Sequence, residues 1–279
     1  MDTYSQITDV SGIRVGHWTD LEAATGCTVI LTESGAVAGV DVRGDSPGTR
    51  ETDLLKSTGR VKEVQALLLS GGSAFGLAAA DGVMKYLEDH SAGFSVGQAV
   101  IPIVPSAILF DLNIGDGSVR PTSMSGYEAC RVAGSGLFAV GNVGAGTGAT
   151  VAKTSGMKCA IKSGLGSSSI RLKNGIVVGS LMVVNAIGSI HDPETGILVA
   201  GPRNAKGIMS SSFDDLVIGQ SEYVVDVGGN TTIGVLATNA DLSEKEVSHM
   251  ATIGHDGLAM AVRPAHLAGD GDAIFSLAT

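Results

Sequence analysis

Residues 228–240 read Gly-Gly-Asn-Thr-Thr-Ile-Gly-Val-Leu-Ala-Thr-Asn-Ala, which joins a glycine pair, an Asn-Thr bond and a β-branched apolar run. The apolar run predicts a strand over residues 232–238. The two glycines let the backbone adopt unusual conformations just before the Asn-Thr bond. We therefore expect the chain to cleave itself between Asn230 and Thr231, giving an α chain of residues 1–230 and a β chain of residues 231–279.

The expected product of this cleavage is a threonine that carries its own base. A threonine hydroxyl is a weak nucleophile near neutral pH and needs a base to activate it. A free α-amine, with a reference pKa of about 7.7–8.0, can serve as that base, but in an intact chain the amine is tied up as an amide. The cut can use the same hydroxyl: Thr231 Oγ attacks the Asn230 carbonyl, the acyl group moves from N to O, and water opens the ester.

Backbone strain at the glycine pair could supply only about 1–3 kcal/mol toward this reaction. Other groups must therefore donate to the oxyanion and move protons. Asp270 and Asp272 are two residues apart, so in an extended segment they share a face and could orient the amine and hydroxyl of Thr231. Two alternatives for this pair are an exposed acidic turn and a calcium-type oxygen cluster.

Two further polar residues stand in small or apolar surroundings. Asn185 follows the apolar residues 181–184, where a buried amide must find a partner. It could donate to an oxyanion, or it could be a structural cap. Lys153 could position and polarise the substrate, or it could be an ordinary solvated lysine.

Composition narrows the class of protein. With 279 residues, the chain is long enough for one large domain or two small ones, with a sizeable core. No shift in composition marks a domain boundary, so we expect a single domain covering residues 1–279. Charged residues make up only 16%, so we expect much of the surface to be buried by self-association. The net charge of −10 argues against nucleic acid and anionic membranes as partners.

Targeting and cofactor signals are also weak. We see neither a secretion signal nor an apolar run of roughly 20 residues, so we expect a cytoplasmic protein. Cys27, Cys130 and Cys159 are odd in number and lack CxxC spacing, which indicates neither a disulfide framework nor a zinc site. The proposed chemistry requires no metal and no organic cofactor.

Apolar runs bounded by Gly, Pro, Asn or Asp predict most of the strands. They cover residues 13–18, 27–31, 37–42, 64–69, 137–143, 169–172, 176–185, 223–227, 232–238 and 273–278. Helices are expected from about residue 76 to 90, over residues 125–133 and after a capping box at residues 243–246, and residues 206–215 are expected to form a loop. Strand pairs mixed with few helices favour an α+β fold, with helices layered on antiparallel sheets.

Two rival sites are weaker. Gly144, Gly146 and Ala149 fit a loose dinucleotide fingerprint, but the acidic ribose partner expected about 20 residues later is absent. His255 and Asp256 could join a serine of residues 210–212 in a Ser-His-Asp set. Adjacent residues of a helix point about 100° apart, so Asp256 is poorly placed to orient its neighbour.

Several motifs in fixed order carry a family resemblance. They are residues 48–53, 70–77, 104–112, 141–148, 230–233 and 270–275. With these motifs the chain resembles the P1-type self-processing peptidases, which include L-aminopeptidase/D-amidase-esterases, β-aminopeptidases and nylon-oligomer hydrolases. The Asn-Thr junction is most similar to that of the nylon-oligomer hydrolases.

The resemblance implies an αββα sandwich like that of N-terminal-nucleophile hydrolases, and tetramers of processed αβ units. It also implies that Thr231 is the nucleophile, with Asp270 and Asp272 behind it and with Lys153 and Asn185 lining the site. Phe110 stands where several relatives have a tyrosine, at a position expected to contact substrate. Relatives usually continue through further helical sequence beyond the position of Thr279.

The sequence thus predicts an autoprocessing amidohydrolase that cleaves short peptides or ω-amino-acid oligomers through an acyl-enzyme on Thr231. The alternatives are an aminopeptidase or D-amidase of the same family, a self-processing acyltransferase, and an unprocessed binding relative.

Overall fold

The computed structural model describes residues 4–55, 61–217 and 229–279. Its helices are α1 (Ala79–Asp89), α2 (Ser123–Arg131), α3 (Ser212–Val217) and α4 (Glu244–Ala261), with 3-10 turns η1 (Ile7–Asp9), η2 (Thr52–Leu55), η3 (Ser73–Ala78) and η4 (Gly144–Gly146). Its strands are β1 (Arg14–Asp20), β2 (Thr25–Arg43), β3 (Thr49–Arg50), β4 (Glu63–Ser70), β5 (Phe94–Val96), β6 (Ala99–Ile101), β7 (Ser106–Ile108), β8 (Thr150–Val151), β9 (Ile161–Lys162), β10 (Leu165–Arg171), β11 (Val177–Asn185), β12 (Ser189–His191), β13 (Leu198–Ala200), β14 (Thr231–Thr238), β15 (Val262–Arg263) and β16 (Asp272–Ala278).

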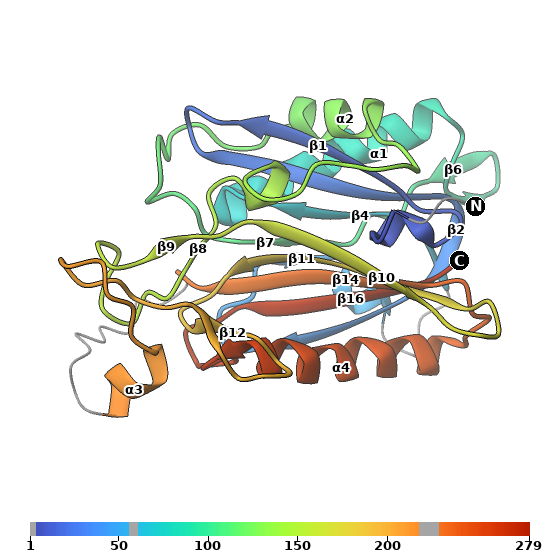
Figure 1. Ribbon diagram of the computed structural model, residues 1–279. Helices are drawn as coiled ribbons and strands as arrows, with labels where there is room; N and C mark the ends of the chain where they lie inside the picture. Colours follow the sequence, from blue (N-terminus) through green and yellow to red (C-terminus); the bar gives the residue numbers. More distant parts are fainter. Residues whose placement is uncertain (1–3, 56–60, 218–228) are drawn as a thin grey trace.

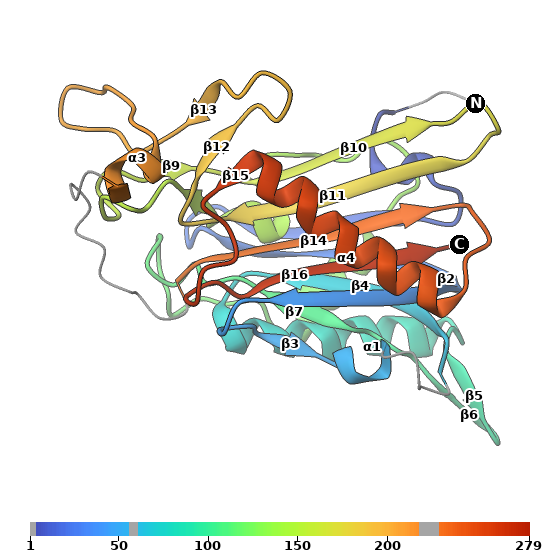
Figure 2. The same ribbon diagram turned by 90° about the horizontal axis from the view of Figure 1, so that it is seen from below.

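The elements stack as helix, sheet, sheet and helix (Figure 1). Helices α1 and α2 cover one layer, which contains β1 and β4, and α4 covers the other layer, which contains β11, β14 and β16 (Figures 1 and 2). The strand order is β10-β11-β14-β16-β2-β4-β7-β3, with β1 added to β2. The expected αββα sandwich is therefore confirmed.

Strand β2 belongs to both layers. Residues 25–31 pair with β1, and residues 37–43 pair with β16. The pairing register with β4 shifts between Leu31 and Ala36, and Gly35 has a φ of +90°. The two strands predicted at residues 27–31 and 37–42 are thus one 19-residue strand, interrupted by an irregularity rather than by a turn.

The alternation of side chains along β4 shows why the sandwich has two kinds of core. Leu67 and Leu69 belong to the apolar cluster between the layers. Ala66 and Leu68 point the opposite way and join the cluster beneath α1 and α2. The continuous apolar run that predicts a strand over residues 64–69 is explained by this double coverage.

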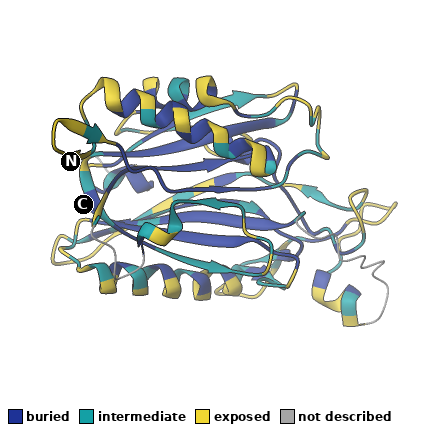
Figure 3. Cartoon of the chain, turned by 180° about the vertical axis from the view of Figure 1, so that it is seen from behind, coloured by how far each residue is buried: buried dark blue, intermediate teal, exposed yellow. Residues whose placement is uncertain are grey.

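Strand β16 divides its side chains in the same way. Phe275 lies in the cluster between the layers, whereas Ile274 lies in the cluster beneath α4 with Leu258. Both layers of strands are largely buried, whereas the outer sides of the helices are exposed (Figure 3). Helix α4 begins with the predicted capping box, in which Ser243 and Glu246 bond each other's backbone N–H groups.

The local predictions are mostly confirmed. Helices α1 and α2, strand β16 and the hairpin of β10 and β11 lie where the sequence places them. Within residues 206–215, expected to be a loop, α3 begins at Ser212. The strand predicted at residues 223–227 lies outside the described residues.

The strand predicted over residues 137–143 is wrong. These residues form a loop in which Leu137 and Val140 are exposed. The backbone N–H and C=O of Phe138 bond to the side-chain amide of Gln6, at 3.1 and 3.0 Å, instead of to a neighbouring strand. A side-chain amide thus satisfies the backbone groups that a sheet would otherwise pair.

None of the helices formed by the described residues is both long and apolar enough to cross a membrane.

Truncation of Phe275 tests the packing between the layers. Phe275 is 0% exposed, so Phe275→Ala should lower the free energy of unfolding by about 3–5 kcal/mol through lost burial and a residual cavity. Urea unfolding measures this change. The control Ile253→Ala, at an exposed position of α4, should change it by about 0.5 kcal/mol or less. Equal losses in the two variants would contradict the assigned core.

Candidate active site

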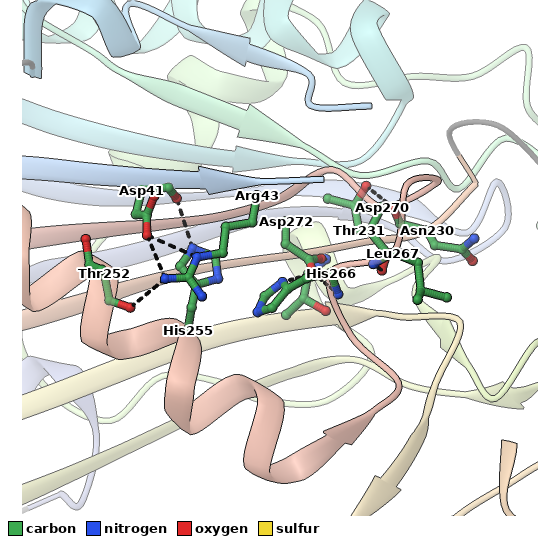
Figure 4. A network of polar contacts seen from close by, with 11 residues as sticks. Asp41, Arg43, Asn230, Thr231, Thr252, His255, His266, Leu267, Asp270 and Asp272 are labelled. Carbon is green, nitrogen blue, oxygen red and sulfur yellow. Dashed lines mark hydrogen bonds and ion pairs between the residues drawn. The ribbon is translucent and has the colours of Figure 1, made fainter. Parts of the chain in front are cut away.

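The predicted site residues meet at one end of the sheet, where β14 and β16 begin and β11 ends. Asn185, the last residue of β11, is directly opposite Thr231, the first residue of β14. Strands β14 and β16 are parallel, and an isolated parallel bridge joins Asn230 to Asp270 just before them. Figure 4 shows Asp270 and Asp272 beside Asn230 and Thr231.

The Asn230–Thr231 bond is buried and its carbonyl is held by two donors. Asn230 and Thr231 are 5% and 3% exposed. Thr231 Oγ1 donates to the Asn230 carbonyl oxygen at 2.5 Å. The backbone N–H of Gly271 donates to the same oxygen at 3.1 Å. A hydroxyl therefore lies against the carbonyl group that precedes it, and a backbone N–H polarises that carbonyl.

Asp272 is fixed on both of its oxygens. Its Oδ1 accepts the Thr232 backbone N–H at 2.6 Å. Its Oδ2 accepts from Nδ1 of His266 at 2.8 Å and from the His266 backbone N–H at 3.3 Å. Asp272 therefore binds the backbone one residue beyond Thr231 and holds the start of β14 in place.

Asp270 is held on one oxygen only. Its Oδ2 accepts the Leu267 backbone N–H at 2.7 Å, whereas its buried Oδ1 has no hydrogen-bond partner among the described residues. Burial, followed by the charge of Asp272, raises the pKa of Asp270 to about 6. Asp270 thus has an accepting oxygen available and a pKa within reach of neutral conditions, as a proton acceptor requires.

Lys153 and Asn185 form the opposite wall. Lys153 Nζ donates to Oδ1 of Asn185 at 2.8 Å, and to the backbone oxygens of Asn185 and Gly229 at 3.0 Å each. The side-chain amide nitrogen of Asn185 donates to Phe110 O at 3.0 Å and to Gly229 O at 3.3 Å. Both side chains therefore hydrogen-bond to the backbone at Gly229, just before the Asn230–Thr231 bond.

These contacts bear on the alternatives for each residue. Asp270 and Asp272 are each 3% exposed, so the exposed acidic turn is ruled out. Three of their four carboxylate oxygens accept hydrogen bonds from N–H groups. A calcium ion needs a cluster of oxygen ligands instead, so this arrangement does not fit a calcium site. Lys153 is half-buried and bonded rather than solvated. The proposed role of Asn185 as an oxyanion donor stays a prediction.

The Phe110 backbone reaches this wall and its side chain is half-buried, so its contact with substrate stays a prediction. The rival Ser-His-Asp set does not form, because His255 Nε2 bonds the Asp41 carbonyl oxygen at 3.1 Å and Asp256 is exposed.

Sequence reasoning missed two donors. The Gly271 N–H has no residue-type signal, since any backbone can supply it. His266 lies in a loop and belongs to no recognisable spacing with Asp272. The one clue to His266 in the sequence is that it lies four residues before Asp270.

The raised pKa of Asp270 predicts a pH-dependent stability difference. Between the unfolded value near 3.8 and the folded value near 6, ionisation favours the unfolded chain, so the stability linked to Asp270 is present at low pH and is lost as the pH rises through about 6. Asp270→Asn mimics the neutral acid. It should therefore raise the free energy of unfolding by about 3 kcal/mol at pH 7, and by little at pH 4.

This comparison is best made by urea unfolding in a Thr231→Ala background, so that both chains carry the same uncleavable bond. A stabilisation of equal size at pH 4 and pH 7 would contradict the raised pKa.

Comparison with known proteins places this chain in a family. Peptidase family S58 matches residues 5–279. A Mycobacterium tuberculosis protein described as an uncharacterized aminopeptidase is 44% identical over 288 residues, which cover 99% of this chain and 81% of that protein. The 6-aminohexanoate-oligomer endohydrolase of Paenarthrobacter ureafaciens is 31% identical over 277 residues, which cover 97% of this chain and 74% of that protein.

Solved structures agree on the fold. The L-aminopeptidase D-Ala-esterase/amidase of Ochrobactrum anthropi, described as a variant of the Ntn hydrolase fold, superposes with a TM-score of 0.73 at 18% identity, covering 99% of this chain and 74% of that chain. A Burkholderia β-aminopeptidase gives 0.68 at 21% identity, covering 99% and 73%. The family that the sequence motifs indicated is confirmed: the chain belongs to peptidase family S58, and it is an amide-bond hydrolase with the Ntn hydrolase fold.

Proposed function

We propose that this hydrolase matures by cleaving its own Asn230–Thr231 bond and then uses Thr231 as its nucleophile. One observation carries the proposal: the Thr231 hydroxyl lies 2.5 Å from the Asn230 carbonyl oxygen, which also accepts the Gly271 N–H. The hydroxyl thus lies beside the carbonyl group that it would attack, and a backbone N–H meets the oxygen on which negative charge would develop. The same hydroxyl becomes the nucleophile toward substrate once the bond is broken.

In the maturation step, Thr231 Oγ attacks the carbonyl carbon of Asn230 and its proton passes to the carboxylate of Asp270. The negative charge develops on the Asn230 oxygen, where the Gly271 N–H stabilises it. The C–N bond breaks as the Thr231 nitrogen takes that proton from Asp270, and this leaves an ester and restores the Asp270 carboxylate. Water then hydrolyses the ester to give the Asn230 carboxylate, the free hydroxyl and the free α-amine.

In turnover, the α-amine of Thr231 takes the hydroxyl proton as Oγ attacks the substrate carbonyl, and it passes that proton to the leaving amine. Water then hydrolyses the acyl-enzyme. Asp272 fixes the start of β14 through the Thr232 N–H, and Asp270 orients the amine. Asn185 and nearby backbone N–H groups stabilise the oxyanion, and Lys153 positions the wall that carries Asn185. No step requires a cofactor.

The proposed substrates are amides of short peptides or ω-amino-acid oligomers, with Phe110 in contact with them. Relatives described as aminopeptidases and as 6-aminohexanoate-oligomer endohydrolases support both classes. Activity toward β-alanyl, L-alanyl, D-alanyl and 6-aminohexanoyl amides would distinguish them. We further propose a cytoplasmic homotetramer of processed αβ units, which the low content of charged residues supports.

Variants at two adjacent threonines test the maturation step. Thr231→Ala removes the attacking hydroxyl, so we expect one intact band near 28 kDa on a denaturing gel and no amidase activity. Thr231→Ser keeps a hydroxyl and should still yield two fragments. Thr232→Val is the matched control: it keeps the backbone N–H and removes a buried hydroxyl that has no partner among the described residues, so it should also be cleaved.

Cleavage of Thr231→Ala at the same bond would refute self-processing by this hydroxyl. Amidase activity in a Thr231→Ala chain that remains whole would show that another group is the nucleophile.

A further inference from the structure

A line of polar groups runs from the start of β14 to helix α4 (Figure 4). It passes from the Thr232 N–H through Asp272 to His266, whose ring meets the ring of His255 edge-on with centroids 4.8 Å apart. The catalytic steps proposed above use Asp272 but assign nothing to the two histidines behind it.

The loop conformation directs two donors of His266 at Asp272. The residue has a φ of +59°, a conformation that residues with a side chain adopt uncommonly. In this conformation both the ring Nδ1 and the backbone N–H donate to the same oxygen, Oδ2 of Asp272. The carboxylate is therefore left with Oδ1 directed at the Thr232 N–H, at 2.6 Å.

We propose that His266 is a positioning residue of the active site, which fixes the orientation of Asp272 and, when protonated, places a positive charge behind the Thr231 nucleophile. This inference rests on the proposed function and deepens it. The His266 ring acts through Asp272 on the backbone next to Thr231, so it adjusts catalysis without touching the substrate.

The groups around His266 set the pKa of its ring. Its side chain is 18% exposed and faces Asp272 on β16, His255 on α4 and, at longer range, Arg43 on β2 and Asp270. The hydrogen bond to Asp272, supported by the negative charge of that carboxylate, raises the pKa of His266. Burial lowers the pKa of His255, which accordingly favours the neutral ring.

The charge on His266 has a consequence that a purely structural contact would not have. A nearby cation disfavours the protonated forms of the Thr231 α-amine and of Asp270 and so lowers their pKa values. Both groups must lose a proton before they can accept one from the Thr231 hydroxyl. Loss of the His266 charge should therefore shift the acid limb of the activity profile to higher pH.

Two substitutions separate the hydrogen bond from the charge. His266→Asn keeps a donor nitrogen at the place of Nδ1 and suits the positive φ, but it carries no charge. It should keep kcat within about tenfold of the parent value and move the acid limb of the kcat/KM profile up by about 0.5 pH unit. His266→Ala removes both features, so kcat should fall about 10²-fold with little change in KM. Its self-cleavage should also be slower.

His249→Ala, at an exposed position of the same helix as His255, is the matched control and should leave kcat and the pH profile unchanged. Parental kcat and an unshifted acid limb in the His266 variants would overturn the proposal. If His266→Ala does not fold, the pH profile of His266→Asn decides alone. One result would refute the role of His266 but leave the proposed function intact. In that result the parent protein is cleaved and active, Thr231→Ala is inert, and the His266 variants match the parent.

Discussion

The parallel pairing of β14 with β16 is the constraint on which the site depends. Parallel strands begin at the same end of a sheet, so the residues just before them are forced together. Here those residues are Asn230–Thr231 on one strand and residues 270–272 on the other, and the Gly271 N–H bonds the Asn230 carbonyl oxygen at 3.1 Å. Two segments about 40 residues apart thus supply the bond to be cut, its polarising donor and the two carboxylates.

Burial makes one of the two carboxylates suited to proton transfer, because it raises the pKa of Asp270. Two carboxylates, each 3% exposed, would repel one another strongly without compensation. Asp272 is compensated by three N–H donors, one of them from the His266 ring. Asp270 has one donor, and its pKa rises to about 6. The less compensated carboxylate is therefore the one best suited to exchange a proton.

The sequence was sufficient where residue type and spacing carry the chemistry. The Asn230–Thr231 junction, the two-residue spacing of Asp270 and Asp272, and a polar Asn185 ending an apolar strand all led to one end of the sheet. It was insufficient where the backbone supplies the contact, as at Gly271, or where a loop brings in a residue without periodicity, as at His266. The polar segment near Gly35 also led to a prediction of two strands where the structure has one long strand. A register irregularity and a turn contain similar residue types, so the sequence does not distinguish them.

The central claim is that the active protein has a free threonine at the start of β14. Intact-mass measurement on freshly purified, active protein, after chemical labelling of α-amines, tests this most directly. The account predicts two chains, one ending at Asn230 and one beginning with a labelled Thr231. A single chain with the bond between residues 230 and 231 unbroken, in material that hydrolyses amides, would contradict it.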